Sequence, residues 1–474
     1  MRRAGGVVLG GLAYLAAGVA AWWHVFTAGA GHTITSQGYG DPAQQVWYLG
    51  WVPHALGAGI DPLVSHAMFA PAGINLMANT SILFPALAAS PVTVLFGPLV
   101  AFNVMVVLAP AVSAFAAWRV FCRYTSFEGG AFLGGLFFGY SPFVVHDLTY
   151  GHLHITLLAF VPLVFALLDD IAVTGRGSAP ARGALLGLVV AAQALTSLEV
   201  LAMLGLVSVL GLAALALRYP SQLRPRLPRA LAGFATAAAV AAALLAWPAW
   251  VLFAGPRRYR GTVFSSPESY VVWLKALVWP KGGGGLFPQM WGAYVGIPLL
   301  VVVLGVALAW GRLRPRNGVL RFAVVLGLIA LVFAMGRTAH LTPHLSTHVP
   351  LPDRVVTRAP FLSDLLPVRF AIVIDFALGL GLAAALGEVR DRLAERRRRG
   401  GRHRAAGKPG LLPGAGAAAL GILALVSPAL GVQWPYPVRQ VAAPAVYRST
   451  LVTHLKPGSI LLGYPVMNGF RSDP

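Results

Sequence analysis

The sequence has little charge, few acids and almost no cysteine. Only 11% of its 474 residues are charged and 57% are hydrophobic, whereas a soluble domain carries roughly a quarter charged residues. A charge content this low excludes an ordinary soluble protein of the same length, because most of the surface need not face water. The one cysteine, Cys122, excludes an internal disulfide and a cysteine-based metal cluster.

Long apolar runs are what the chain has instead. Its mean hydropathy is +0.72, and the runs approach the roughly 20 residues that a helix needs to cross a bilayer. Because lipid offers the backbone no hydrogen bonds, such spans are helices rather than strands. Residues 1–430 are therefore predicted to form an all-α, polytopic bundle of about eleven spans. The predicted spans are residues 4–24, 99–121, 129–146, 154–172, 183–198, 200–217, 230–254, 294–311, 319–336, 370–387 and 411–430.

The basic residues predict how these spans are oriented. The net charge of +21 reflects 36 Lys and Arg against 15 Asp and Glu. With Met1 in the cytoplasm and the spans alternating, about two thirds of the basic residues fall in short cytoplasmic loops, as the positive-inside rule requires. The run Arg396–Arg399 then faces lipid headgroups and is not a nucleic-acid site. The Ala-, Arg-, Gly- and Pro-rich composition is typical of a high-GC bacterium, so we expect a bacterial plasma-membrane protein with an external C-terminus.

Long segments on the external side separate some of the spans. They are expected at about residues 25–98, 256–293 and 337–369, and the first should carry juxtamembrane helices. Residues 82–96 are apolar but short and contain two prolines, which predicts an interfacial or re-entrant helix. The N-terminal run also resembles a signal peptide, but its length favours an uncleaved first span.

The tail, residues 431–474, is also expected on the external side. Residues 458–465 read as a single strand, and a single strand needs a sheet to join. We therefore interpret the tail as part of a truncated soluble domain.

Asp41 is the strongest candidate for a catalytic residue. It follows the first span in Gly-Tyr-Gly-Asp-Pro-Ala-Gln-Gln-Val-Trp, which begins at Gly38. A carboxylate here can accept a proton from a hydroxyl if a low-dielectric cleft raises its basicity. The alternative is structural, since Asp-Pro-Ala-Gln is typical of a helix start. Both interpretations hold together if the helix fixes the carboxylate in place.

A polar turn between two apolar runs contains three histidines and an aspartate. These residues are His146, Asp147, His152 and His154. They are suited to a divalent cation, the one candidate cofactor, but their spacing matches no zinc pattern. The alternative is that they hydrogen-bond a polar headgroup or one another, and we assign no metal ligand.

Acids near other span ends are weaker candidates. Glu199 lies at a tight turn between two predicted spans, where an ionisable residue is either functional or simply solvated. Asp375 lies near the start of its predicted helix, and we expect it to pair with Arg369.

An arginine cluster opens the second external segment. It consists of Arg257, Arg258 and Arg260. Guanidinium groups suit phosphate oxygens. Because this segment is expected on the external side, the positive-inside rule does not explain its arginines. We expect contacts with a lipid-linked phosphate or with an ordinary lipid headgroup.

The layout resembles the GT-C superfamily of polytopic membrane glycosyltransferases, including its bacterial members, which use polyprenyl-phosphate-linked sugars. Similar features are the acid after the first span in Gly-Asp-Pro, the short helix at 82–96, Ser141-Pro142 closing a span, and Pro-Val-Arg-Phe at 367–370 entering one. The resemblance covers most of the chain in architecture and rests on short motifs.

This resemblance implies an inverting glycosyltransferase that acts on the external face. Asp41 would be the general base that deprotonates an acceptor hydroxyl, and the arginine cluster would hold the donor phosphate. The polar turn and Glu199 would contribute to substrate binding. The implied partners are a polyprenyl-phosphate-linked sugar, a lipid or glycan acceptor and the membrane, with no nucleic acid. Some members of the family bind a metal through paired acids, and here no second carboxylate directly follows Asp41.

Two other functions are compatible with the sequence. A transporter or flippase for a polyprenyl-linked lipid or glycolipid should show charged or broken helices at the membrane midplane in related halves. The chain has few midplane charges and no matched halves. A non-catalytic membrane scaffold would need neither Asp41 nor the arginine cluster.

Overall fold

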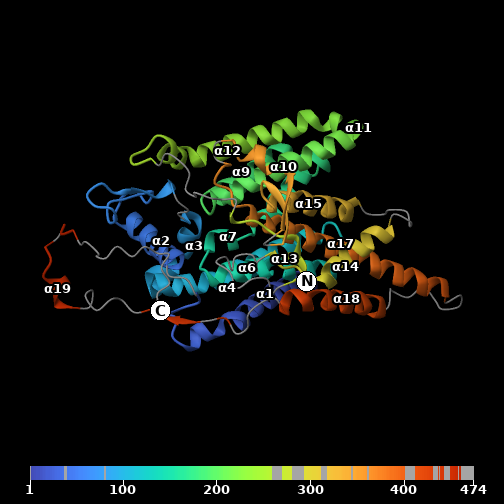
Figure 1. Ribbon diagram of the computed structural model, residues 1–474, viewed down its shortest axis with the longest axis horizontal. Coiled ribbons are helices and arrows are strands. Elements are labelled where there is room, and N and C mark those ends of the chain that lie inside the picture. The colour runs from blue at the N-terminus through green and yellow to red at the C-terminus, as the bar shows by residue number, and fades with distance from the viewer. Residues whose placement is uncertain are drawn as a thin grey trace.

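The chain folds into helices that run side by side along one axis of the molecule (Figure 1). Within the described residues, seven helical segments are long and apolar enough to cross a membrane, and four further apolar helices are shorter. These helices confirm the predicted all-α, polytopic architecture. The computed structural model describes residues 2–36, 40–78, 82–258, 269–279, 293–310, 318–342, 345–359, 362–400, 411–430, 436, 438–441, 449–456 and 458–460.

The long apolar segments follow the predicted spans to within a few residues, except that the helix predicted at 370–387 continues to Gly400. They contain α1 (Arg2–Thr27), α4 (Pro98–Phe121), α7 (Leu153–Thr156) with α8 (Phe160–Leu168), α10 (Leu198–Arg218), α11 (Pro220–Leu223) with α12 (Leu227–Phe253), α17 (Ala371–Gly400) and α18 (Leu411–Leu430).

The shorter apolar helices fill the remaining predicted positions. They are α3 (Leu83–Phe96), α9 (Ala179–Ala194), α14 (Ile297–Trp310) and α15 (Gly318–Ala334). The expected short helix at 82–96 is thus present as α3, and it packs against α2 (Gly40–Gly57). In Figure 1, α2 and α3 lie towards the left and α11 lies at the right, and we call these the α2 end and the α11 end of the bundle.

One predicted span, residues 129–146, is wrong as a single helix. It consists of α5 (Glu128–Gly139) and α6 (Pro142–Thr149), with a break at Tyr140 and Ser141. The Ser141 hydroxyl accepts a hydrogen bond from the N–H of Val144 at 3.4 Å, and Pro142 occupies the first turn of the new helix. Serine as N-cap followed by proline favours a fresh helix start over continuation of the old one. The polar turn of the sequence therefore begins on a helix of its own.

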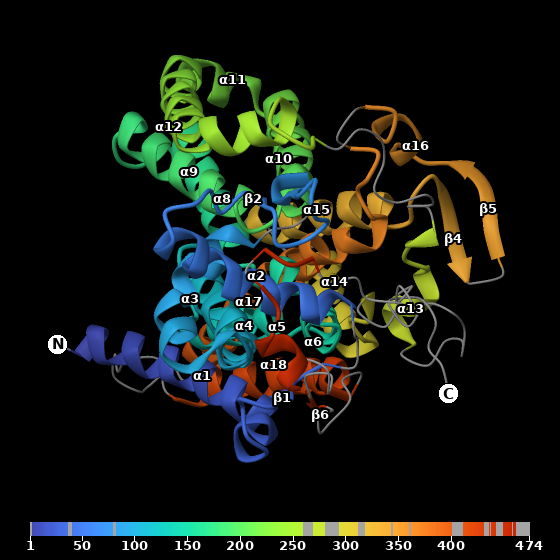
Figure 2. The same cartoon turned by 90° about the vertical axis from the view of Figure 1, so that its left-hand side faces the viewer.

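The centre of the bundle is α17, around which α5, α14, α15 and α18 pack (Figure 2). Its most apolar stretch is completely buried. Gly134 of α5 and Gly379 of α17 lie so close that a Cβ on Gly134 would collide with the Gly379 carbonyl. Small residues at such crossings allow helix backbones to approach closely inside a membrane. The start of α17 is consequently a fixed point against which other side chains are positioned.

In the described part of the chain, three pairs of short antiparallel strands connect the segments between helices. The first joins β1 (Thr33–Ile34) to β6 (Arg439–Gln440), so that residues after the first span meet the tail. In the tail, residues 458–460 form no strand, and the rest of the predicted strand lies outside the described residues. The other pairs are β2 (Val64–Ser65) with β3 (Ile74–Asn75), and β4 (Thr338–Thr342) with β5 (Leu345–Pro350).

Candidate active site

Asp41 lies in the first turn of α2, and its side chain is 61% exposed. A carboxylate is favoured near the N-terminus of a helix, where the backbone N–H groups point outwards. Pro42 follows in the same turn, a position where its missing N–H costs nothing. The expectation that Asp-Pro-Ala-Gln opens a helix is confirmed. The helix start therefore places an accessible carboxylate at the α2 end of the bundle.

Gly151 allows the polar turn to reach this carboxylate. Its φ is +78°, a conformation that glycine adopts without strain. A Cβ at this position would meet Cγ of Pro42 at 2.6 Å. A side chain at residue 151 would therefore push the turn away from the start of α2, and with it the next residue, His152.

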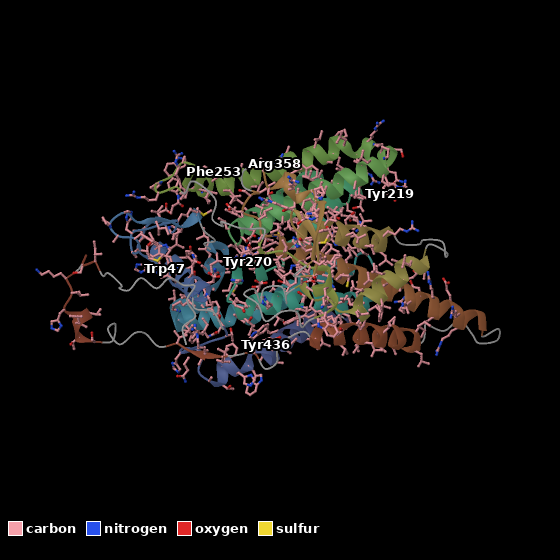
Figure 3. All side chains as sticks on the ribbon, in the orientation of Figure 1. Trp47, Tyr219, Phe253, Tyr270, Arg358 and Tyr436 are labelled. Atoms are coloured by element: carbon pink, nitrogen blue, oxygen red, sulfur yellow. The ribbon has the colours of Figure 1, made fainter. Side chains whose placement is uncertain are left out.

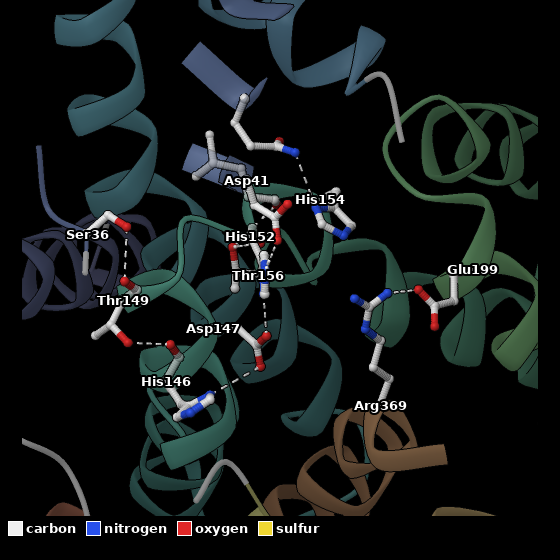
Figure 4. Close-up of polar contacts among 12 residues, drawn as sticks. Ser36, Asp41, His146, Asp147, Thr149, His152, His154, Thr156, Glu199 and Arg369 are labelled. Atoms are coloured by element: carbon white, nitrogen blue, oxygen red, sulfur yellow. Dashed lines mark hydrogen bonds and ion pairs between the residues drawn. The ribbon is translucent and has the colours of Figure 1, made fainter. Parts of the chain in front are cut away.

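His152 bridges two carboxylates that are far apart in the sequence (Figure 4). Its Nε2 lies 2.8 Å from Oδ2 of Asp41, and its Nδ1 lies 2.7 Å from Oδ1 of Asp147. The side chains of His152 and Asp147 are only 10% and 12% exposed. The three residues form a line from an exposed carboxylate into the protein, which we call the Asp41–His152–Asp147 chain.

The geometry favours a protonated imidazole in this chain. An imidazole can donate through both nitrogens only when it carries two N–H groups. Burial lowers the pKa of His152, but the hydrogen bonds to Asp147 and Asp41 outweigh burial and raise the pKa above its ordinary value. The exposed carboxylate is thus held by a cationic donor and not by a neutral one.

The same contacts lower the pKa values of the two acids. The hydrogen bond from His152 holds the pKa of Asp41 below its ordinary value despite partial burial, and the positive charge of Arg369 acts in the same direction. Burial raises the pKa of Asp147, but the neighbouring His152 and His146 bring it below its ordinary value. The condition that we set for Asp41 as a base, a low-dielectric cleft that raises its basicity, is therefore not met by the side chain as it stands.

The other two histidines of the polar turn lie beside the Asp41–His152–Asp147 chain. His154 is buried, with its Nδ1 at 3.5 Å from Nε2 of Gln45, and its ring packs edge-on against His152 at 5.6 Å. His146 lies with its Nδ1 at 4.0 Å from Oδ2 of Asp147. Neither ring nitrogen of His146 has a hydrogen-bond partner in the described part of the chain. All four residues of the polar turn that the sequence singled out are thus brought together, and His152 is the one shown in contact with Asp41.

Glu199 lies beside this group, in an ion pair with Arg369. Its Oε1 also accepts a hydrogen bond from the N–H of Leu366 at 3.1 Å. The side chains of Glu199 and Arg369 are 15% and 12% exposed, so Glu199 is not simply solvated. Arg369 is a residue that our site prediction missed. The available signal was a lone arginine at the start of an apolar run.

Asp375 does not pair with Arg369 as we expected. Its carboxyl group lies against Ser141 instead, inside α17. The two residues are more than one helical turn apart, and Glu199 reaches Arg369 from a different helix. The sequence spacing alone did not show that Glu199, and not Asp375, would pair with Arg369.

The arginine cluster lies at the α2 end but is not shown in contact with Asp41. Nε of Arg257 donates to the Ala72 carbonyl at 2.9 Å, and Nη1 of Arg258 donates to the Phe253 carbonyl at 3.4 Å. Both side chains are exposed. Arg260 lies outside the described residues. The structure therefore leaves Arg257 and Arg258 as surface cations near the end of α12.

The acids and histidines are not arranged as a metal site. Among the residues that the structure describes, no three His, Cys, Asp or Glu side chains come together in a way that would hold a metal ion. Both nitrogens of His152 face carboxylate oxygens, and a protonated imidazole has no lone pair for a metal. The donor set as placed fits proton transfer and ion pairing better than coordination.

Stability of the Asp41–His152–Asp147 chain is expected to depend on pH. The raised pKa of His152 contributes stability that is present below its ordinary value of 6.5 and lost as the pH rises through the folded value. The lowered pKa values of Asp41 and Asp147 contribute stability that is present above 3.8 and lost as the pH falls through the folded values. We expect the stability difference between wild type and His152→Gln to be largest between pH 3.8 and 6.5.

Thermal unfolding in detergent across the pH range measures this difference. His348→Gln, which changes an exposed histidine of β5, is the matched control and should show no such maximum. A difference for His152→Gln that is constant at every pH would contradict the proposed charge on His152.

Comparison with known proteins finds little to which the chain can be related. The sequence matches no known protein family and no curated protein. One solved structure, the apo form of the oligosaccharyltransferase of Archaeoglobus fulgidus, aligns over 90% of this chain with 13% identity and a TM-score of 0.49. The chain covers 55% of that protein. Similarity this low does not assign the chain to a family, and the site has to be interpreted from its own geometry.

Proposed function

We propose that the chain is a membrane glycosyltransferase that moves a sugar from a polyprenyl-phosphate-linked donor to an acceptor hydroxyl. The observation that carries the proposal is the exposed carboxylate of Asp41, held in one orientation by buried His152 and Asp147 at one end of a membrane bundle. Rigid support of a reactive group by buried hydrogen bonds is what catalysis requires of a positioned base. The resemblance of the motifs to the GT-C superfamily points to the same reaction class.

Asp41 would act as the general base for the attacking hydroxyl. One carboxylate oxygen is occupied by His152, which leaves Oδ1 to accept the hydroxyl proton. The acceptor oxygen forms a bond to the anomeric carbon, the bond from that carbon to the phosphate oxygen breaks, and the phosphate leaves with the electron pair. Displacement from the opposite face inverts the configuration at the anomeric carbon.

The lowered pKa of Asp41 bears on when the proton moves. A carboxylate with a lowered pKa is ionised throughout the neutral pH range and is always ready to accept. It takes the proton only after the attacking oxygen has become acidic through bond formation. The transfer is therefore expected to be late in the reaction, with Asp41 orienting the hydroxyl in the ground state.

Arg369 is the described cation best placed to act on the phosphate of the donor. Its charge already influences Asp41, and a guanidinium group suits phosphate oxygens. Glu199 holds it from one side. We propose that Arg369 contributes to donor binding from the floor of the site. Arg257 and Arg258 are proposed to contact the donor or the headgroups of neighbouring lipids from the surface.

The proposed topology places this chemistry on the external face of a bacterial plasma membrane. The support is the predicted excess of Lys and Arg in the opposite loops. With the N-terminus in the cytoplasm, the α2 end faces outwards. Acceptors are then a lipid or a glycan of the cell envelope.

The experiment that tests the function follows a labelled sugar in sealed vesicles that contain the chain. Vesicles are loaded with a donor labelled in the sugar and, separately, in the polyprenyl part, and vesicles without the chain are the control. Transfer predicts that the sugar label moves to an acceptor while the polyprenyl label stays in the membrane lipid. If instead both labels cross the bilayer together and the donor stays intact, the chain is the lipid transporter that we kept as the alternative.

A further inference from the structure

A long apolar groove lies at the α11 end of the bundle, away from Asp41. It has a volume of about 650 Å³ and is bounded by α8, α10, α15 and α17, a size typical of ligand pockets. Figure 3 shows Tyr219, at one end of the groove, on the opposite side of the molecule from Trp47 of α2. The groove is therefore separate from the candidate active site.

The length of the groove matches one leaflet of a bilayer. Along α10 it runs from Leu204 to Arg218, about 21 Å at roughly 1.5 Å per residue. Along α15 it runs from Gly318 to Ile329, about 16 Å by the same measure. One leaflet with its headgroups is about 20 Å thick. A lipid that lies parallel to these helices therefore fits the groove from its rim to the middle of the membrane.

The walls of the groove suit a hydrocarbon chain. Three phenylalanines from α8, α15 and α17 form its floor, with the ring of Phe165 at 5.5 Å from Phe322 and at 5.3 Å from Phe376. Gly211 of α10 lines one side, and a Cβ built there meets no atom within 4 Å. Each methylene group buried against such surfaces adds to the stability of a bound lipid.

The rim of the groove carries positive charge. Arg218 and Arg321 both line it, and within the described ranges no carboxylate pairs with either. Arg218 lies over the ring of Tyr219 at 5.0 Å. The one acid at the rim, Asp169, already accepts a hydrogen bond from the Tyr124 hydroxyl at 2.8 Å. The two guanidinium groups leave a net positive rim beside apolar walls.

We propose that this groove binds an anionic phospholipid of the surrounding leaflet, with its phosphate at Arg218 and Arg321 and an acyl chain along α10 and α15. Guanidinium groups bind phosphate oxygens through paired hydrogen bonds. The lipid is not the sugar donor, because a donor must present its phosphate near Asp41 at the opposite end. This distinction from the donor rests on the proposed function, whereas the binding of an anionic lipid to the groove does not.

Lipid retention by the purified protein tests the rim. The protein is extracted from vesicles of equal parts phosphatidylglycerol and phosphatidylcholine, and the bound lipids are counted by native mass spectrometry. We expect phosphatidylglycerol to be retained in preference. Replacing one arginine by glutamine, Arg218→Gln or Arg321→Gln, should lower its retention about fivefold, and both changes together about 30-fold. Arg224→Gln, an exposed arginine at the same end, should leave retention unchanged.

A second pair of variants tests the walls. Gly211→Trp fills the groove, whereas Gly205→Trp puts the same side chain on α10 outside it, where a Cβ also meets no atom within 4 Å. Loss of phosphatidylglycerol in the first variant only would support the proposal. Equal retention of the two lipids by wild type, or unchanged retention in Gly211→Trp and in the double arginine variant, would overturn it.

Discussion

Asparagine in place of Asp41 is expected to lower the rate of sugar transfer by about 10²- to 10⁴-fold, the usual contribution of a general base. Asparagine has the same shape, and its carbonyl oxygen can still accept the hydrogen bond from Nε2 of His152. The turn and α2 should therefore keep their positions while the proton acceptor is lost. The measurement is the initial rate of transfer from a labelled polyprenyl-phosphate-sugar, with binding of the donor measured separately.

The matched control is Asp61→Asn. Asp61 lies on the segment after α2, and its carboxylate accepts hydrogen bonds from the N–H of Leu63 at 2.8 Å and from the indole of Trp247 at 3.2 Å. The asparagine oxygen can still accept from the N–H of Leu63, which bonds Oδ1, and only the exposed bond from Trp247 to Oδ2 is lost. Transfer should therefore stay close to the wild-type rate. Full activity of Asp41→Asn would remove Asp41 from the chemistry and leave the carboxylate a purely structural role at the start of α2.

Glu199→Ala is expected to destabilise the protein by about 3–5 kcal/mol, the usual effect of leaving one member of a buried ion pair uncompensated. Arg369 is only 12% exposed, so water compensates its charge poorly when its partner is removed. The N–H of Leu366 also loses its acceptor, Oε1 of Glu199. The measurement is the free energy of unfolding in mixed detergent micelles.

A double variant and a control variant separate the causes. Removing the charge as well, in Glu199→Ala with Arg369→Met, should recover much of the stability, because no buried charge is then left unpaired. Glu388→Ala breaks a pair with Arg392 one helical turn away on α17, and should cost about 0.2–0.5 kcal/mol. If Glu199→Ala were no worse than Glu388→Ala, the pair at Arg369 would not be a structural support of the site.

The helices were predictable because their cause is local. In lipid, an apolar run has to satisfy its backbone hydrogen bonds internally, so the run by itself specifies a helix. The shortness of residues 82–96 likewise predicted a short helix, which is α3. Residues 129–146 were harder because Tyr140 and Ser141 are compatible with continuation. The break depends on the N-cap bond from Val144 to Ser141 and on Pro142 in the first turn of α6.

Residue types pointed to most residues of the candidate site, but not to the contacts between them. Asp41, His152 and Asp147 were each notable in the sequence, since acids and histidines are scarce beside so many apolar residues. The pairing of Glu199 with Arg369 was not foreseen, because the nearer acid in the sequence, Asp375, was the natural partner. Glu199 pairs with Arg369 because the start of α10 lies beside Leu366 and Arg369.

Composition and apolar runs were enough to establish that this chain forms membrane helices and that its few acids and histidines gather near certain helix ends. The contact of Asp41 with His152 across 111 residues, and the lowered pKa of Asp41 that results from it, follow from the fold. Periodicity and composition describe residues that are neighbours along the sequence. The contact between Asp41 and His152 depends instead on the close approach of Gly151 to Pro42. A hydrogen bond of 2.8 Å requires two backbones to be positioned together, and no local pattern carries that information.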